Sequence, residues 1–284
     1  MRKYLFLLMM LPTVCFSKTS VWHISKDGSE LYLGGTIHLL RKDDYPLPVE
    51  FNKAFKKSDT LVLETDLDAA KSPAFGQKVA QMFTYPPGQS LKNEIDQKTF
   101  NRLQKYLSDR KLPVEQFLSY KPAMLVMVMS VLELQKMGMV DIGVDEYFFN
   151  KAKKSGKHTA YLETVDQQLE YIRSMGAGDA NDVIMSTIDD MSRLDEMLDV
   201  IKSSWLKGDE KKMADATLSD MMRDYPDLYE ILLVKRNNNW IPQLERMMSN
   251  KKVELVLVGA LHLVGEKGLL QQLREQGYVV RQFE

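Results

Sequence analysis

The chain has 284 residues, 44% of them hydrophobic, with 38 basic and 39 acidic side chains and a formal net charge of −1. This length suffices for one large domain or two small ones with a sizeable core. Because charges of both signs are interspersed, the composition indicates no nucleic-acid or other polyanionic partner.

Residues 1–17 have the pattern of a bacterial-type secretory signal peptide. Arg2 and Lys3 precede an apolar run over residues 5–11, and Cys15-Phe16-Ser17 provides a small-x-small cleavage site. We therefore expect a periplasmic or secreted protein. Lipid attachment at the cysteine is the weaker alternative, because bulky residues stand upstream of it where small ones are preferred.

Cleavage after Ser17 leaves a mature chain, residues 18–284, that contains no cysteine. Disulfides and zinc–thiolate sites are thereby excluded from the mature protein. Its longest uncharged apolar run, Ala123 to Leu132, is too short to cross a bilayer, so we expect no membrane span.

The first part of the mature chain predicts strands and one helix. Residues 21–24 and 30–37 flank Lys26-Asp27-Gly28-Ser29, a strong hairpin signal, and His38 follows the second strand. A helix is predicted over residues 49–57. The next apolar run, residues 60–63, is typical of a short buried strand, and Glu64 stands at its end.

The middle of the chain is predominantly helical by apolar spacing. Helices are predicted over about 71–140 and again over about 176–250, and the second stretch carries the polar cluster Arg236-Asn237-Asn238-Asn239-Trp240. Between them, residues 158–162 predict a third strand, and Glu163 stands at its end. Because no low-complexity linker divides the chain, we predict a single domain over residues 18–284 with these helices as a large insertion.

The end of the chain repeats a phrase from its beginning. Leu31-Tyr32-Leu33-Gly34-Gly35-Thr36-Ile37-His38-Leu39 aligns without a gap with Leu255-Val256-Leu257-Val258-Gly259-Ala260-Leu261-His262-Leu263. Each copy predicts a buried strand, a tight turn at glycine and a histidine at the strand end. With a last strand over 278–283, we predict an α/β fold: a mixed central sheet formed by the N- and C-terminal parts and flanked by helices.

Ligands of α/β proteins bind at the carboxyl ends of the strands, where this sequence places His38, Glu64, Glu163 and His262. Two imidazoles and a carboxylate form the usual ligand set of a catalytic divalent metal, such as Zn²⁺ or Mn²⁺. We predict His38, His262 and Glu64 as ligands. A carboxylate outside the ligand set would act as general base. Alternatively Glu64 is this base rather than a ligand, and for that role it is favoured over Glu163, which stands beside a capping Thr; which of the two glutamates is base and which is ligand stays open.

Arg236 or Asn237 is predicted to stabilise a developing oxyanion. Each of these residues also has an ordinary structural explanation. A single histidine of this kind is more often part of a core or turn, an arginine in a helix usually pairs on the surface, and glutamates often cap helices. The paired histidine motifs favour the functional interpretation.

The chain resembles the TraB/GumN family, which is related to the animal TIKI proteases. The resemblance runs from about residue 21 to 283. It rests on Tyr32-Leu33-Gly34-Gly35-Thr36-Ile37-His38, Leu61-Val62-Leu63-Glu64, Gly143-Val144-Asp145, Leu162-Glu163-Thr164, Lys235-Arg236-Asn237-Asn238-Asn239-Trp240 and Val258-Gly259-Ala260-Leu261-His262-Leu263-Val264-Gly265. One departure is Lys235, which stands where the family usually has an acidic residue.

The resemblance implies an α/β fold shared with erythromycin-esterase-like and haem-binding ChaN-like proteins. It also implies the metal-dependent hydrolase or protease activity of the TIKI branch, with His38, Glu64, Glu163, Arg236 and His262 as the site. We therefore expect an exported metal-dependent hydrolase acting on a peptide or small-molecule substrate. Two alternatives stay open: a haem- or iron-binding protein using the same histidines without turnover, and a non-catalytic partner-binding protein. The oligomeric state is not determined by the sequence.

Overall fold

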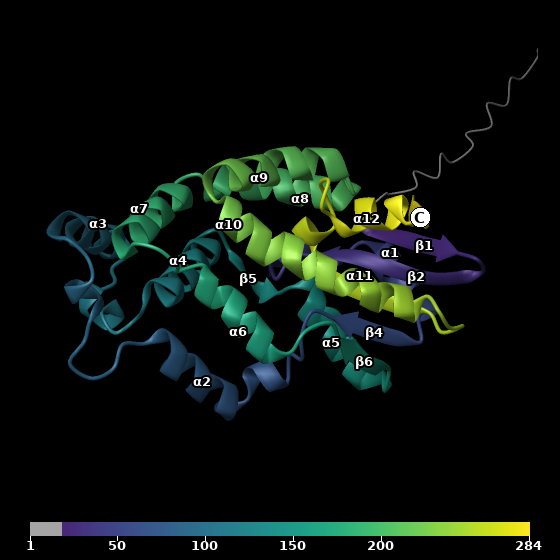
Figure 1. The fold of residues 1–284 in the computed structure, drawn as a ribbon, viewed down its shortest axis with the longest axis horizontal. Coiled ribbons are helices and arrows are strands. Elements are labelled where there is room, and N and C mark those ends of the chain that lie inside the picture. Colours follow the sequence, from purple (N-terminus) through teal and green to yellow (C-terminus); the bar gives the residue numbers. More distant parts are fainter. Residues whose placement is uncertain (1–18) are drawn as a thin grey trace, which may run out of the picture.

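A computed structural model describes residues 19–284. The predicted signal peptide, its cleavage site and Cys15 lie outside this range. At the centre is a six-stranded sheet with the strand order β6-β4-β7-β2-β1-β8 (Figure 1). Its strands are β1 (Val21–Lys26), β2 (Ser29–Thr36), β4 (Thr60–Leu63), β6 (His158–Tyr161), β7 (Glu254–Gly259) and β8 (Val279–Gln282).

The sheet is mixed, as the sequence predicts. Strands β6, β4, β7 and β2 are parallel, whereas β1 pairs antiparallel with both β2 and β8. The two copies of the repeated phrase form the neighbouring strands β2 and β7, in which Gly35 lies opposite Val258. Residues from the two ends of the chain therefore lie side by side, and the fold class is confirmed.

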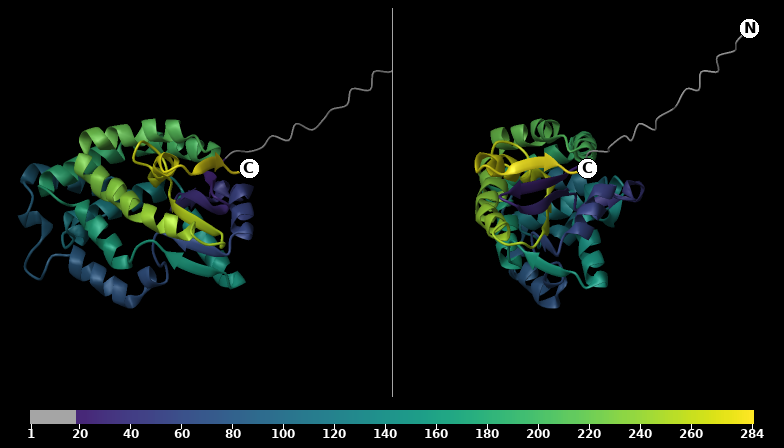
Figure 2. Two further views of the ribbon diagram at one scale, coloured as in Figure 1. Left: turned by 45° about the vertical axis from the view of Figure 1, so that its right-hand side comes forward. Right: turned by 90° about the vertical axis from the view of Figure 1, so that its right-hand side faces the viewer.

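Helices cover both faces of this sheet (Figure 2). Helices α1 (Val49–Lys57) and α5 (Val144–Ser155) lie on one face, and α11 (Lys235–Met247) and α12 (Leu269–Glu275) lie on the other. Phe51 of α1 stacks on Phe148 of α5 and also contacts the Trp205 ring. These rings join the buried strand residues in the main hydrophobic core.

Further helices extend the molecule away from the sheet, towards the left of Figure 1: α2 (Pro73–Phe83), α3 (Gln97–Ser108), α4 (Pro122–Lys136), α6 (Val165–Ser174) and α7 (Ala180–Met191). Helices α8 (Leu194–Lys207) and α9 (Glu210–Asp224) instead contribute Trp205, Met213 and Leu218 to the main core, and α10 (Pro226–Tyr229) follows them. Helices α3, α4 and α7 enclose a second hydrophobic core around Leu103, Leu125 and Ile184. No helix within residues 19–284 is long and apolar enough to span a membrane.

Two short features go beyond the predicted elements. Strands β3 (Leu39–Arg41) and β5 (Met139–Ile142) form an antiparallel ribbon. No element was predicted for β3, and β5 begins where helix was predicted, over about 71–140. Such short strands leave too few residues for an alternating pattern to be recognised. In addition, residues 230–234 form a π-helical turn that leads into α11.

Candidate active site

The strand ends of the parallel sheet bring the predicted acidic residues together. Glu64 directly follows β4, and Glu163 lies just beyond the end of the neighbouring strand β6. The pairing continues past both strands, because the Glu163 amide donates to the Glu64 carbonyl oxygen at 2.8 Å. The two carboxylates therefore enter the same space at the carboxyl edge of the sheet.

The two predicted histidines meet this space around Gly259, the last residue of β7. A Cβ built on this glycine would stand 3.4 Å from Glu64 Oε1, 3.6 Å from His262 Cδ2 and 3.9 Å from His38 Nε2. The missing side chain thus leaves a small space that three of the predicted functional side chains border. His38 and His262 therefore lie close together at this edge of the sheet.

Arg236 joins the carboxylates to one histidine. Its Nε and Nη2 donate to the two carboxylate oxygens of Glu163, each at 2.9 Å, and Nη2 also donates to Glu64 Oε2. Its Nη1 lies 3.1 Å from His262 Nε2. The Arg236 side chain is 10% exposed, so the surface salt bridge that is common for helical arginines is not its role here.

Asn237 fixes the tautomer of His262. Its Nδ2 donates to the carbonyl oxygens of His262 and Lys267, at 3.1 and 2.9 Å, so its Oδ1 is an acceptor for His262 Nδ1 at 2.7 Å. The ring proton therefore lies on Nδ1, and the Nε2 lone pair accepts from Arg236. Burial lowers the pKa of His262 to about 3, which agrees with a neutral ring.

Glu64 is held as a carboxylate. Its Oε1 accepts the Gly259 amide at 2.6 Å, and its Oε2 accepts from Gln168 Nε2 at 3.3 Å as well as from Arg236. Burial raises the pKa of Glu64, but the positive charge of Arg236 opposes burial and, with the two histidines and the Gly259 amide, leaves the pKa at about 2.

His38 differs from His262 in exposure and in its partner. The His38 side chain is 66% exposed, and its Nδ1 lies 3.3 Å from Asp145 Oδ2. The carboxylate of Asp145 raises the pKa of His38 above its ordinary value. Nδ1 is thus occupied, and Nε2 is the nitrogen that faces the space beside Gly259.

The close approach of two backbone segments explains how Asp145 reaches His38. Gly143 precedes α5, and a Cβ there would stand 2.3 Å from the Ile37 carbonyl oxygen and 2.4 Å from the His38 carbonyl carbon. Only glycine permits this contact, which the Val144 amide secures by donating to Ile37 O at 3.1 Å. The Gly143-Val144-Asp145 motif was visible in the sequence, but nothing in it indicated a partner for Asp145.

Trp240 also belongs to the site and received no role from the sequence. Its Nε1 donates to Glu163 Oε1 at 2.9 Å, and its ring centroid lies 4.4 Å from that of His262. One helical turn separates Trp240 from Arg236, so both side chains lie on the same face of α11. The apolar spacing of this helix was the available signal, but it predicted burial only.

The structure thus brings together His38, Glu64, Glu163, Arg236, Asn237 and His262. The remaining histidines lie elsewhere: His23 pairs with Glu30 at 2.6 Å, and His158 is exposed at the start of β6. Within residues 19–284, no three His, Cys, Asp or Glu side chains form a group arranged to hold a metal ion. In this arrangement Arg236 Nη1 occupies the His262 Nε2 lone pair that a metal would need.

Comparison with known proteins places nearly all of the described residues in one family. The model of the TraB/PrgY/gumN family matches residues 20–282. The chain is 26% identical over 247 residues to YbaP of Escherichia coli (strain K12), described as an uncharacterized protein, which covers 86% of this chain and 87% of YbaP. The YbaP of Shigella flexneri matches with the same identity and coverage. The chain belongs to the TraB/PrgY/gumN family.

Proposed function

We propose that this protein is an exported hydrolase, acting on a peptide or ester bond at the carboxyl edge of the sheet with the help of a divalent metal. One observation carries the proposal: His38 Nε2, Glu64 Oε1 and the His262 ring border the space beside Gly259. Imidazole nitrogens and a carboxylate at the end of parallel strands are the groups that metal-assisted hydrolysis uses.

Two features of the donor set support a metal. The Nδ1 atoms of both histidines are occupied, by Asp145 and by Asn237, which orients each Nε2 as in metal-binding histidines. Gly259 leaves open the place that a side chain would fill. One contact must change, because Arg236 Nη1 has to release His262 Nε2 before this nitrogen can ligate. His38, His262 and Glu64 then hold the metal.

When bound, the metal would lower the pKa of a water molecule and polarise the scissile carbonyl. The chain itself supplies the other parts of the site. Arg236 presents a buried guanidinium that is fixed by two carboxylates and suited to stabilising an oxyanion. Glu163 positions this arginine, since both of its oxygens are taken up by Arg236 and Trp240. Glu64, with each oxygen already accepting a hydrogen bond, fits a ligand better than the general base favoured by its sequence position.

The test measures bound metal and hydrolysis together. Purified protein is stripped with a chelator, reconstituted with Zn²⁺ or Mn²⁺, and assayed against panels of peptides and esters. His38→Ala and His262→Ala should lose both metal and activity, whereas the matched control His158→Ala should keep both. Full metal content and full activity in both site variants would contradict the proposal.

Further measurements separate the alternatives. Glu64→Gln should lose the metal if Glu64 is a ligand; retained metal with kcat lowered by about 10²–10⁴-fold would make Glu64 the general base. Activity that survives chelation would assign proton transfer to the His38–Asp145 pair without a metal. A visible absorption band of the purified protein would favour the haem- or iron-binding alternative. N-terminal sequencing of exported material should begin at Lys18.

A further inference from the structure

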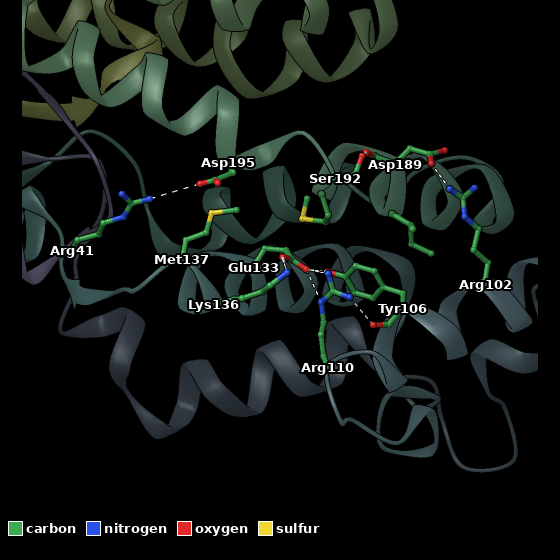
Figure 3. A pocket seen from close by; sticks show the side chains of 12 residues that line it. Arg41, Arg102, Tyr106, Arg110, Glu133, Lys136, Met137, Asp189, Ser192 and Asp195 are labelled. Atoms are coloured by element: carbon green, nitrogen blue, oxygen red, sulfur yellow. Dashed lines mark hydrogen bonds and ion pairs between the residues drawn. The ribbon is translucent and has the colours of Figure 1, made fainter.

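A cavity of about 880 Å³ lies in the helical part of the molecule, away from the site described above (Figure 3). Its walls come from the end of β3, from α3 and α4, and from the connection between α7 and α8. None of its lining residues belongs to the His38 and Glu64 site. Its volume is within the range of small-molecule pockets, roughly 300–1,000 Å³.

A buried ion pair forms one wall of this cavity. Glu133 is 2% exposed, and its Oε1 accepts from the Tyr106 hydroxyl at 2.8 Å and from Arg110 Nε at 2.5 Å. The Arg110 guanidinium also lies 3.5 Å above the Tyr106 ring, where cation–π attraction holds it. This wall is fixed before any ligand arrives. Lys136 Nζ lies 3.7 Å from the second carboxylate oxygen, Oε2.

Two cations at the same cavity are held far less firmly. Arg41 Nη2 lies 3.8 Å from Asp195, and Lys136 Nζ lies 3.7 Å from Glu133. Both distances exceed hydrogen-bond length, so neither cation is hydrogen-bonded to its acidic neighbour. A carboxylate that binds a cation through both of its oxygens would make shorter contacts. Figure 3 shows Arg41 reaching towards Asp195, and Lys136 beside Glu133.

The lining carries charges of both signs in an arrangement suited to a small zwitterion. Four cations, Arg41, Arg102, Arg110 and Lys136, face three acids, Glu133, Asp189 and Asp195. We propose that this cavity binds a free amino acid or short peptide, with the ligand carboxylate between Arg41 and Lys136 and its ammonium towards the acidic wall. The four cations of the lining would also attract a dianionic phosphate, but only a zwitterion offers in addition an ammonium group to Glu133, Asp189 and Asp195.

This inference concerns binding and does not require the proposed hydrolase activity. The probe is the dipeptide alanyl-alanine, titrated calorimetrically into the whole protein, with recovery of intact dipeptide checked by chromatography. We expect saturable binding that is at least about tenfold weaker in the double variant Arg41→Gln/Lys136→Gln, because a charge-assisted hydrogen bond contributes that much. The matched control Lys211→Gln/Arg223→Gln removes two exposed cations from α9 and should bind like the unaltered protein.

Two ligand analogues test the zwitterion directly. Alanyl-alanine amide lacks the carboxylate and N-acetyl-alanyl-alanine lacks the ammonium, so both should bind more weakly than the dipeptide. The proposal is overturned if alanyl-alanine shows no saturable binding, if the Arg41/Lys136 variant binds it unchanged, or if the N-acetyl form binds equally well. Tighter binding of inorganic phosphate would also overturn it.

Discussion

The molecule contains two buried clusters in which an arginine holds a glutamate, and they differ in how the chain builds them. In the helical half, Glu133 takes its partners from residues 23 and 27 positions away, on a neighbouring helix and its end. At the sheet edge, Arg236 takes Glu163 and Glu64 from 73 and 172 positions away. The first cluster needs one packed pair of helices, whereas the second exists only when the whole sheet is assembled.

The clusters differ also in what surrounds them. Glu133 is buried, accepts the Tyr106 hydroxyl and, with Arg110, forms a wall of the charged cavity. Two histidines and a glycine adjoin the Arg236 cluster, and the missing side chain of the glycine leaves space there. Every carboxylate oxygen of the cluster accepts a hydrogen bond. A similar ion pair thus joins packed helices and forms a wall of the cavity in the helical half. At the sheet edge it orients a set of potentially reactive side chains.

The substitution with the largest expected effect removes Arg236 from the sheet-edge cluster. Arg236→Met should lower the free energy of unfolding by about 3–5 kcal/mol, because it leaves the buried carboxylates of Glu64 and Glu163 without their cation. Urea unfolding followed by circular dichroism measures this loss. The control is Arg173→Met, which removes a pair that is exposed on both sides. Similar stability in the two variants would contradict the central place given to Arg236.

The contacts of Arg236 show which part of the site could be predicted from the sequence and which part could not. The strand-end pattern predicted where His38, Glu64, Glu163 and His262 lie, because a strand must deliver the residue after it to the sheet edge. That pattern could not show that one guanidinium would contact three of them. This contact depends on the angle of α11 and on the π-helical turn over residues 230–234, for which the sequence carries no recognisable signal.

Asp145 and the charged cavity were missed for a related reason. Asp145 is positioned by a ribbon whose strands have three and four residues, too short for a period-two pattern. The cavity is lined from several elements, and each of its charged residues alone is typical of a solvated helix face. Contacts between elements decide both features, while apolar periodicity predicts only the elements themselves.

A smaller substitution tests the sheet-edge cluster by filling the space beside Gly259 while leaving the ion pairs intact. Gly259→Ala places a methyl group at ordinary contact distance from Glu64 and His262, and the backbone there, at φ −50° and ψ 135°, suits alanine. We expect metal affinity to fall about 10–100-fold while unfolding free energy changes by less than about 0.5 kcal/mol. Metal titration and urea unfolding of the same sample measure both quantities.

The matching control is Gly76→Ala, at a helical glycine with open space around the added methyl group. It should leave metal affinity unchanged. If Gly259→Ala binds metal as tightly as the unaltered protein, the space beside this glycine is not the binding place.

In the helical half, Arg110→Met should lower the free energy of unfolding by about 1–2 kcal/mol, which is less than the loss expected for Arg236→Met. Arg110→Met affects a single carboxylate, Glu133, which keeps the Tyr106 hydroxyl and has Lys136 Nζ at 3.7 Å. Arg236→Met instead leaves two carboxylates without their cation. The comparison is made by urea unfolding alongside Arg236→Met. An equal or larger loss for Arg110→Met would mean that Tyr106 and Lys136 do not stabilise the Glu133 carboxylate once Arg110 is removed.

The smallest expected effect concerns the opposite end of strand β7, where Glu254 is 6% exposed and its Oε2 has no hydrogen-bond partner. Burial, and then the charge of Asp59, raise the pKa of Glu254 in the folded state. The folded protein therefore holds this proton more tightly than the unfolded chain, and its stability decreases as the pH rises from the unfolded pKa through the raised one. Glu254→Gln removes this penalty and should stabilise the protein at pH 7 by about 1 kcal/mol.

The gain should disappear near pH 4, where Glu254 is protonated in the unaltered protein as well. Urea unfolding at the two pH values, compared between variant and parent, isolates this residue from the other carboxylates. Glu115→Gln, at an exposed position, is the control and should change stability at neither pH. A loss of stability at pH 7 in Glu254→Gln would mean that the ionised carboxylate is favourably held. In that case well-satisfied carboxylates would lie at both ends of β7, Glu254 at one end and Glu64 against the Gly259 amide at the other, and hydrogen bonding of the acid would no longer distinguish the candidate active site from the rest of the sheet.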